Sequence, residues 1–126
     1  MSFLPAKDRQ YLESKGLNFE EVIDGQQKGI VIKGFKLPPG RYDTEQADIL
    51  ILLPSGYPDA PPDMFYLQPW VKLLPGLKYP NAADQPLVFN SQKWQRWSRH
   101  NNEWRSGTDG IWTMLKRVEN ALEVAA

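Results

Sequence analysis

Apolar and polar positions follow two different periods along this chain, and the helical period occurs near its two ends. Pro5 to Lys15 has apolar residues at helical spacing and is followed by Gly16, which suits the left-handed residue after a helix. Asp109 to Val124 has apolar residues at spacings of three and four, with Thr108 before it as a candidate N-cap. The pattern therefore predicts one N-terminal and one C-terminal helix.

Shorter apolar segments between these helices predict four strands. Gly29 to Leu37 is rich in β-branched residues, and Ala47 to Leu53 is almost continuously apolar, which is typical of a strand buried on both faces. Phe19 to Ile23 and Met64 to Leu67 are the other two candidates. Because the connections are short, an antiparallel meander is the simplest topology. The predicted fold class is α+β, in one domain that spans residues 1–126.

Residues 68–108 differ from the rest because they show little periodicity of either kind. They include four of the five tryptophans and many polar residues. A segment of this length without regular structure is unusual in a compact domain and is often functional. We therefore expect an irregular segment that carries the functional residues.

Composition excludes several classes of function. Fifteen basic residues balance fifteen acidic ones, so no net charge attracts nucleic acid or an anionic membrane. No apolar run is long enough to span a bilayer, and the first ten residues lack the order of a signal peptide, so a cytoplasmic protein is expected. The chain has no cysteine and one histidine, which excludes disulfides, thiol nucleophiles and the usual zinc sites. We expect neither a metal nor a cofactor.

Three motifs resemble those of ubiquitin-conjugating-enzyme (UBC) domains. Residues 57–62 read Tyr-Pro-Asp-Ala-Pro-Pro, which matches the YPxxPP turn between two strands of the UBC sheet. Prolines fix their own φ and push the preceding residue to extended geometry, so this turn is predicted to be stiff. Residues 79–81, Tyr-Pro-Asn, resemble the family's HPN motif, and Trp104 with residues 111–115 resembles the tryptophan and helix that follow its catalytic loop. The stiff turn consists mainly of Tyr57, Pro58, Pro61 and Pro62.

The resemblance runs from about residue 12 to residue 122 and implies a UBC-like fold, but the chain departs from the family at the catalytic position. The family's usual chemistry is a thioester on a cysteine. Counting from Tyr-Pro-Asn as the family counts from HPN places Phe89 at the cysteine position, and a shift of one or two residues places Val88, Asn90 or Ser91 there. With this departure the chain resembles two groups: cysteine-less UBC variants that bind ubiquitin without carrying it, and divergent bacterial UBC-like proteins called prokaryotic family E. The sequence looks closest to the second group.

This resemblance implies a component of a bacterial ubiquitin-like conjugation system. Proteins of prokaryotic family E are found with ubiquitin-like modifiers, activating enzymes and JAB-type peptidases, which are therefore the expected partners. Without a cysteine, the chain is expected to bind or orient the modifier or the activating enzyme rather than to carry a thioester. One alternative is a general protein-interaction module that shares only the fold, since a fold does not determine a function.

A second alternative is enzymatic, with the modifier held as an oxyester on a serine. Ser91 would be the nucleophile, activated by His100 or Asp84, because a hydroxyl is a weak nucleophile without a base. In the UBC family the asparagine of HPN is credited with stabilising the oxyanion, and Asn81 occupies that place. Each residue also has a structural interpretation: Asn81 as a turn residue, Ser91 as a loop serine, and His100 as part of an exposed polar loop.

Aromatic and basic residues alternate between positions 94 and 105. These residue types are enriched at interface hot spots, and they also stack single-stranded nucleic acid, which the balanced charge disfavours. The alternative is that they pack the irregular segment onto the sheet. We expect Trp104 and Trp112 to point inward, and at least one of Trp94 and Trp97 to be exposed at a partner surface. The residues assigned to partner binding are Trp94, Trp97, Arg96 and Arg99.

Overall fold

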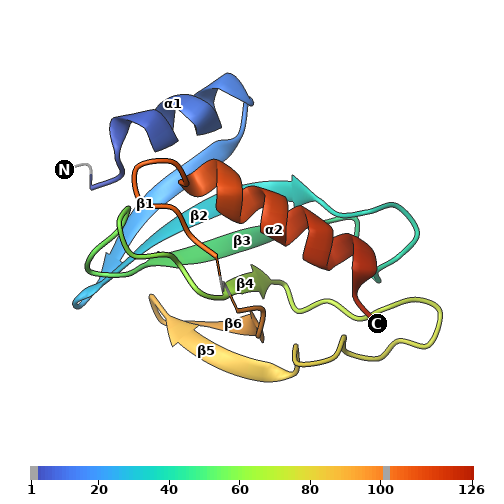
Figure 1. The fold of residues 1–126 in the computed structure, drawn as a ribbon. Helices are drawn as coiled ribbons and strands as arrows, with labels where there is room; N and C mark the ends of the chain where they lie inside the picture. Colours follow the sequence, from blue (N-terminus) through green and yellow to red (C-terminus); the bar gives the residue numbers. More distant parts are fainter. Residues whose placement is uncertain (1–2, 101–102) are drawn as a thin grey trace.

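The computed structural model describes residues 3–100 and 103–126. Six antiparallel strands form one sheet in the order β1-β2-β3-β4-β6-β5, and the C-terminal helix crosses one of its faces (Figure 1). The α+β prediction, with a helix near each end of the chain, is confirmed. The elements are α1 (Ala6–Ser14), β1 (Asn18–Asp24), β2 (Gln27–Lys36), β3 (Gln46–Leu53), β4 (Phe65–Gln68), β5 (Gln85–Phe89), β6 (Gln92–Trp97) and α2 (Ile111–Val124).

The two predicted helices and the four predicted strands lie within two residues of their expected bounds. Gly16 has a φ of +68° and follows α1 as predicted. The prediction of Thr108 as the N-cap of α2 is wrong, because the helix begins at Ile111 after Gly110. The Ile111 N–H donates to Oδ1 of Asp8 at 3.4 Å instead. A carboxylate from α1 thus faces the positive end of α2, a long-range contact that local sequence does not show.

The prediction of an irregular segment over residues 68–108 is wrong where residues 85–97 form the β5–β6 hairpin. The sequence signal of this hairpin is weak. β5 contains Pro86, which is tolerated because this strand lies at the edge of the sheet. The two-residue turn is Asn90-Ser91, with φ values of +52° and +63°, where such turns often contain glycine. The sheet therefore has six strands instead of the predicted four.

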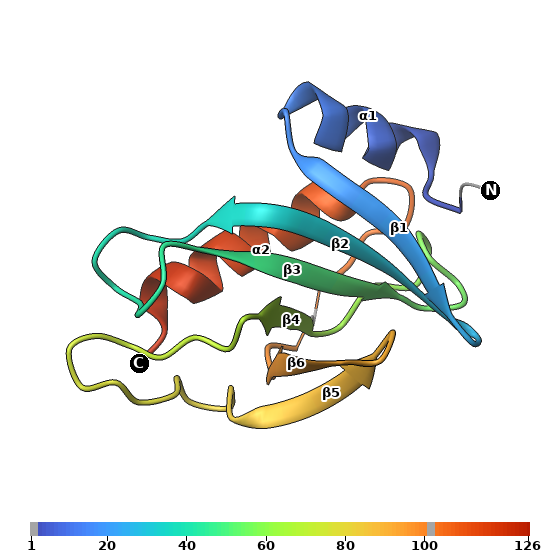
Figure 2. The same ribbon diagram turned by 180° about the vertical axis from the view of Figure 1, so that it is seen from behind.

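Two hydrophobic cores lie on opposite faces of the sheet. The larger core lies between the sheet and α2, whereas the smaller one lies on the face that α2 does not cover, which we call the helix-free face (Figure 2). The apolar side of α2 is buried as its spacing predicts, through Ile111, Met114, Leu115, Val118 and Leu122. The fully or nearly fully buried members of the smaller core are Val31, Leu50, Tyr66, Phe89 and Trp94.

The tip of the β5–β6 hairpin covers part of the helix-free face. Phe89 is fully buried, and its ring lies against Gly29 of β2. A Cβ atom at Gly29 would lie 3.0 Å from Cζ of Phe89 and 2.8 Å from Cδ1 of Leu50, so this close approach requires glycine. The Asn90 N–H donates to Oδ2 of Asp24 at 2.9 Å. These contacts join the hairpin tip to β2 and to the end of β1.

Candidate functional site

The loop between β4 and β5, residues 69–84, carries the Tyr-Pro-Asn motif and is fastened to β6 by one buried side chain. Gln95 is fully buried. Its Nε2 donates to the carbonyls of Val71 (3.0 Å) and Ala83 (2.8 Å). Its Oε1 accepts from the Val71 N–H (3.0 Å) and from Nε1 of Trp97 (3.2 Å). Because all polar groups of this amide are satisfied, Gln95 can hold the loop in place without a large desolvation penalty.

Tyr79, which stands where the family's motif has histidine, belongs to a surface aromatic group. Its side chain is 38% exposed, and its ring lies edge-on to that of Trp70 with centroids 5.7 Å apart. The Lys72 ammonium lies 5.1 Å from the same ring centroid. These contacts keep the Tyr79 ring at the surface of the loop.

Asn81 is held by its backbone and leaves its side chain exposed. Its N–H donates to the Ala126 carbonyl at 2.9 Å, and its carbonyl accepts from Nη1 of Arg99 at 3.1 Å. The Asn81 side-chain amide has no hydrogen-bond partner within the described residues. This amide is therefore available to a bound molecule, and its role as an oxyanion donor stays a prediction.

The four positions that counting aligns with the family's cysteine differ sharply in their surroundings. Phe89 is 0% exposed and packs in the smaller core, whereas Val88 points to the other side of β5 and is 61% exposed. Asn90 and Ser91 form the exposed turn of the hairpin. The segment at the cysteine position is therefore a structural cover of the helix-free face.

Ser91 and His100 lie beyond opposite ends of β6, so the structure does not bring the predicted pair together. The strand has six residues, which span about 20 Å at roughly 3.3 Å per residue. Nδ1 of His100 lies 3.2 Å from Oδ2 of Asp63, and both side chains are more than half exposed. Within the described residues, the polar contacts of His100 are with Asp63 alone.

Asn81 and Asp84 lie near the C-terminal end of β6, apart from Ser91. The Ala82 carbonyl accepts a hydrogen bond from the Ser98 N–H at 3.0 Å, which ties this part of the loop to the residues after β6. Asp84 is exposed and directly precedes β5. The predicted nucleophile is thus separated from the predicted oxyanion donor and from both predicted bases.

The prediction that at least one of Trp94 and Trp97 is exposed is wrong, because their exposed fractions are 3% and 0%. Residues three apart on a strand point to opposite faces, and each face of this sheet has its own core. Trp97 stacks on Phe65 with centroids 5.3 Å apart. Arg99 lies 5.1 Å from the Trp97 ring centroid, and burial lowers its pKa. Arg96 and Arg99 are half-buried. Of the four residues predicted to form the partner surface, these two arginines reach solvent and the two tryptophans do not.

The stiff turn that begins with Tyr57 joins α1 to the start of α2. The Tyr57 hydroxyl donates to Oδ2 of the buried Asp8. Burial raises the pKa of Asp8, although the hydrogen bonds from Tyr57 and the Ile111 N–H act in the opposite direction. Burial and the nearby Asp8 both raise the pKa of Tyr57. The turn therefore has a structural role, because it connects α1 with the start of α2.

Trp104 was predicted to point inward, and its side chain is half-buried. Its Nε1 donates to the Pro58 carbonyl of the same turn at 2.9 Å. The prediction is therefore correct in part.

Sequence reasoning missed an exposed apolar group on the loop between β4 and β5. Leu74 is 41% exposed and Leu77 is 55% exposed, and Tyr79 lies on the same loop. The available signal is the sequence Leu-Leu-Pro-Gly-Leu, in which leucines flank a turn that is normally polar.

None of the helices in the described part of the chain is long and apolar enough to cross a membrane. The same residues contain no group of three or more His, Cys, Asp or Glu side chains that could hold a metal ion.

Comparison with known proteins connects this arrangement to one family. The model of the family described as prokaryotic E2 family E matches residues 4–125, nearly the whole chain. No curated protein and no solved structure matches the chain.

Proposed function

The chain belongs to prokaryotic E2 family E, and on this premise we propose that it serves a ubiquitin-like conjugation system by binding a partner rather than by carrying an acyl group. One observation supports the proposal most strongly. Phe89, which counting places at the family's cysteine, is fully buried. An attacking atom must approach the reacting carbon to within about 3–3.5 Å. A side chain that fills a core offers no such approach.

The proposed binding surface is the loop between β4 and β5. Leu74, Leu77 and Tyr79 expose apolar and aromatic area there, and exposed groups of this kind mark protein interfaces. Gln95 and two isolated β-bridges at Leu73 hold the loop in place. A loop that is already ordered loses little conformational entropy on binding.

The proposed partner is the ubiquitin-like modifier or the activating enzyme of the same system, with a JAB-type peptidase as a third candidate. The balance of fifteen basic and fifteen acidic residues argues against nucleic acid. We place this activity in the bacterial cytoplasm.

The test combines a binding assay with a charging assay. The purified protein is mixed with the modifier and the activating enzyme encoded in the same genome, with and without ATP. Calorimetry and gel filtration measure binding, and a non-reducing gel detects an adduct. We expect a complex without an adduct, and we expect Leu74→Asp/Leu77→Asp to weaken it at least about tenfold.

Ile23→Asp is the matched control, since Ile23 is 56% exposed and lies on β1 at the other edge of the sheet. Equal weakening by the control, or no complex with either protein, would overturn the proposal. An adduct that survives thiol and is cleaved by hydroxylamine would establish the oxyester alternative, and its loss in Ser91→Ala would identify the serine. A complex with proteins outside such a system, and none within it, would favour the general interaction module.

A further inference from the structure

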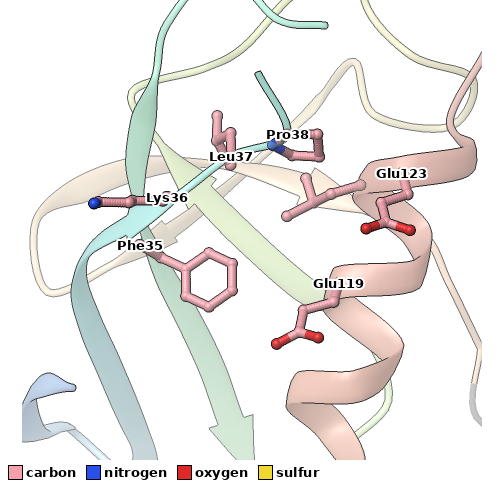
Figure 3. Close-up of a pocket in the computed structure, with 7 residues that line it drawn as sticks. Phe35, Lys36, Leu37, Pro38, Glu119 and Glu123 are labelled. Carbon is pink, nitrogen blue, oxygen red and sulfur yellow. The ribbon is translucent and has the colours of Figure 1, made fainter. Parts of the chain in front are cut away.

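A separate pocket lies between the end of β2 and the C-terminal half of α2. It has a volume of about 220 Å³. Figure 3 shows the Phe35 ring and Leu37 on one side and the carboxylates of Glu119 and Glu123 on the helix side. Leu37 and Leu122 are almost fully buried and form apolar walls. The pocket therefore combines apolar walls with two negative charges at its rim.

No ion pair neutralises these two charges in the part of the chain that the structure describes. Glu119 and Glu123 are exposed, and neither forms an ion pair or side-chain hydrogen bond within residues 3–100 and 103–126. Lys36 lines the same pocket, but Figure 3 shows its side chain pointing away from both carboxylates. Arg41 donates to the carbonyls of Leu122 and Ala125 instead. Lys116 lies one turn before Glu119 on α2 and is exposed, and it forms no ion pair with either glutamate in the described part of the chain.

The placement of the two glutamates is also unfavourable for the helix itself. They lie four residues apart, where like charges repel, and near the C-terminal end of α2, where the helix dipole disfavours negative charge. The last turn of α2 contains no basic residue. A cation bound at this rim would relieve the repulsion between the two glutamates.

A second cavity lies next to this pocket, and the two together give room for more than one side chain. That cavity has a volume of about 320 Å³, and it shares Lys36, Leu37 and Pro38 with the first. Glu45 is among the residues that line the second cavity. A groove of this form, apolar inside and mainly acidic at its rim, suits an extended peptide.

We propose that this groove binds a linear segment of a partner protein in which a Lys or Arg adjoins an aliphatic side chain. The aliphatic group would contact Phe35 and Leu37, and the cation would lie between Glu119 and Glu123. This surface is distinct from the loop between β4 and β5, so the two proposals stand or fail separately.

The test uses two matched probes, acetyl-Leu-Arg-Leu-amide and acetyl-Leu-Gln-Leu-amide, titrated into the ¹⁵N-labelled protein. We expect the arginine peptide to shift the amide signals of residues 35–37 and 119–124 and to saturate, with the glutamine peptide binding more weakly. In Glu119→Gln/Glu123→Gln the affinity for the arginine peptide should fall about fivefold. The thermal midpoint of that variant should be equal to or above that of the wild type, because the repulsion is removed.

The control variant is Glu13→Gln/Glu20→Gln, which removes two exposed carboxylates on α1 and β1 and should leave peptide binding unchanged. The proposal is overturned if the arginine peptide causes no localised shifts, if both peptides bind equally, or if the control weakens binding as much as the groove variant. A lower thermal midpoint of the groove variant would show that the glutamates have a structural role and would also contradict the proposal.

Discussion

The two faces of the sheet are covered in different ways. On one face α2 presents a continuous apolar side, which any helical plot of residues 111–124 reveals. On the helix-free face the cover is the tip of a hairpin, held by contacts such as that of the Asn90 N–H with Asp24, 66 residues away. The segment that motif counting aligns with a catalytic loop thus belongs to this second cover. Motif spacing alone therefore assigns chemistry to a position that the fold uses for packing.

The largest effect that tests this comparison is expected from Phe89→Ala. Removing a buried aromatic ring lowers the free energy of unfolding by about 3–5 kcal/mol. Val88→Ala is the matched control, because the neighbouring side chain is 61% exposed and its truncation should change stability by less than about 0.5 kcal/mol. Urea denaturation measures both. Equal effects of the two substitutions would show that the hairpin does not cover the helix-free face.

The difference between the faces also explains which parts of the structure the sequence predicts. α2 and the strands of the meander were predictable because their signals are local, as in the spacing of Ile111, Leu115 and Val118. The β5–β6 hairpin was not predictable in this way, because the burial of Phe89 depends on a distant glycine, Gly29. Its turn also lacks the glycine that normally marks a two-residue hairpin.

The candidate site was predictable as residue types but not as an arrangement. Asn81 was predicted from a motif, Ser91 from counting to the cysteine position, and His100 as the one histidine of the chain. Whether they meet depends on β6, which was not predicted from the sequence and which separates Ser91 from the other two. The burial of Trp94 and Trp97 follows from the same strand, since a strand side chain points to one face or the other. The groove beside Glu119 was missed because its walls come from β2 and α2 together.

An intermediate effect is expected where the helix-covered face depends on a long-range contact. Asp8→Ala removes the acceptor of the Tyr57 hydroxyl and of the Ile111 N–H at the start of α2. Leaving such groups without partners lowers the free energy of unfolding by about 1–3 kcal/mol. Asp8→Asn keeps an acceptor oxygen, so its free energy of unfolding should fall by less than that of Asp8→Ala. If both variants retain wild-type stability in urea, the contact does not hold α2 in place.

The same residue predicts a dependence on pH. Burial raises the pKa of Asp8 in the folded state above the ordinary value of 3.8, so the folded protein binds this proton more tightly than the unfolded chain. The contribution of Asp8 to stability is therefore complete below pH 3.8 and decreases as pH rises towards the raised folded pKa. The difference in unfolding free energy between wild type and Asp8→Asn should accordingly be larger at pH 4 than at pH 7. A constant or opposite difference would show that ionised Asp8 is not penalised by burial.

The smallest effect concerns the tip of the cover, where Ser91 adopts a left-handed conformation with a φ of +63°. Glycine reaches this conformation without steric penalty, while its greater freedom in the unfolded chain offsets part of the gain. We expect Ser91→Gly to raise the free energy of unfolding by about 0.5–1 kcal/mol. Ser91→Ala keeps the backbone strain and should change the free energy of unfolding by less than about 0.5 kcal/mol.

These two variants also separate a turn residue from a nucleophile, because both remove the hydroxyl but only one relieves the strain. As a turn residue, Ser91 can be replaced by either without loss of partner binding, and hydrogen exchange of the Asn90 amide should slow in Ser91→Gly alone. As a nucleophile, Ser91 would be required for any adduct, and both variants would abolish it equally. The hairpin tip then would be more than a cover, and the contrast between the two faces would need a chemical explanation as well as a structural one.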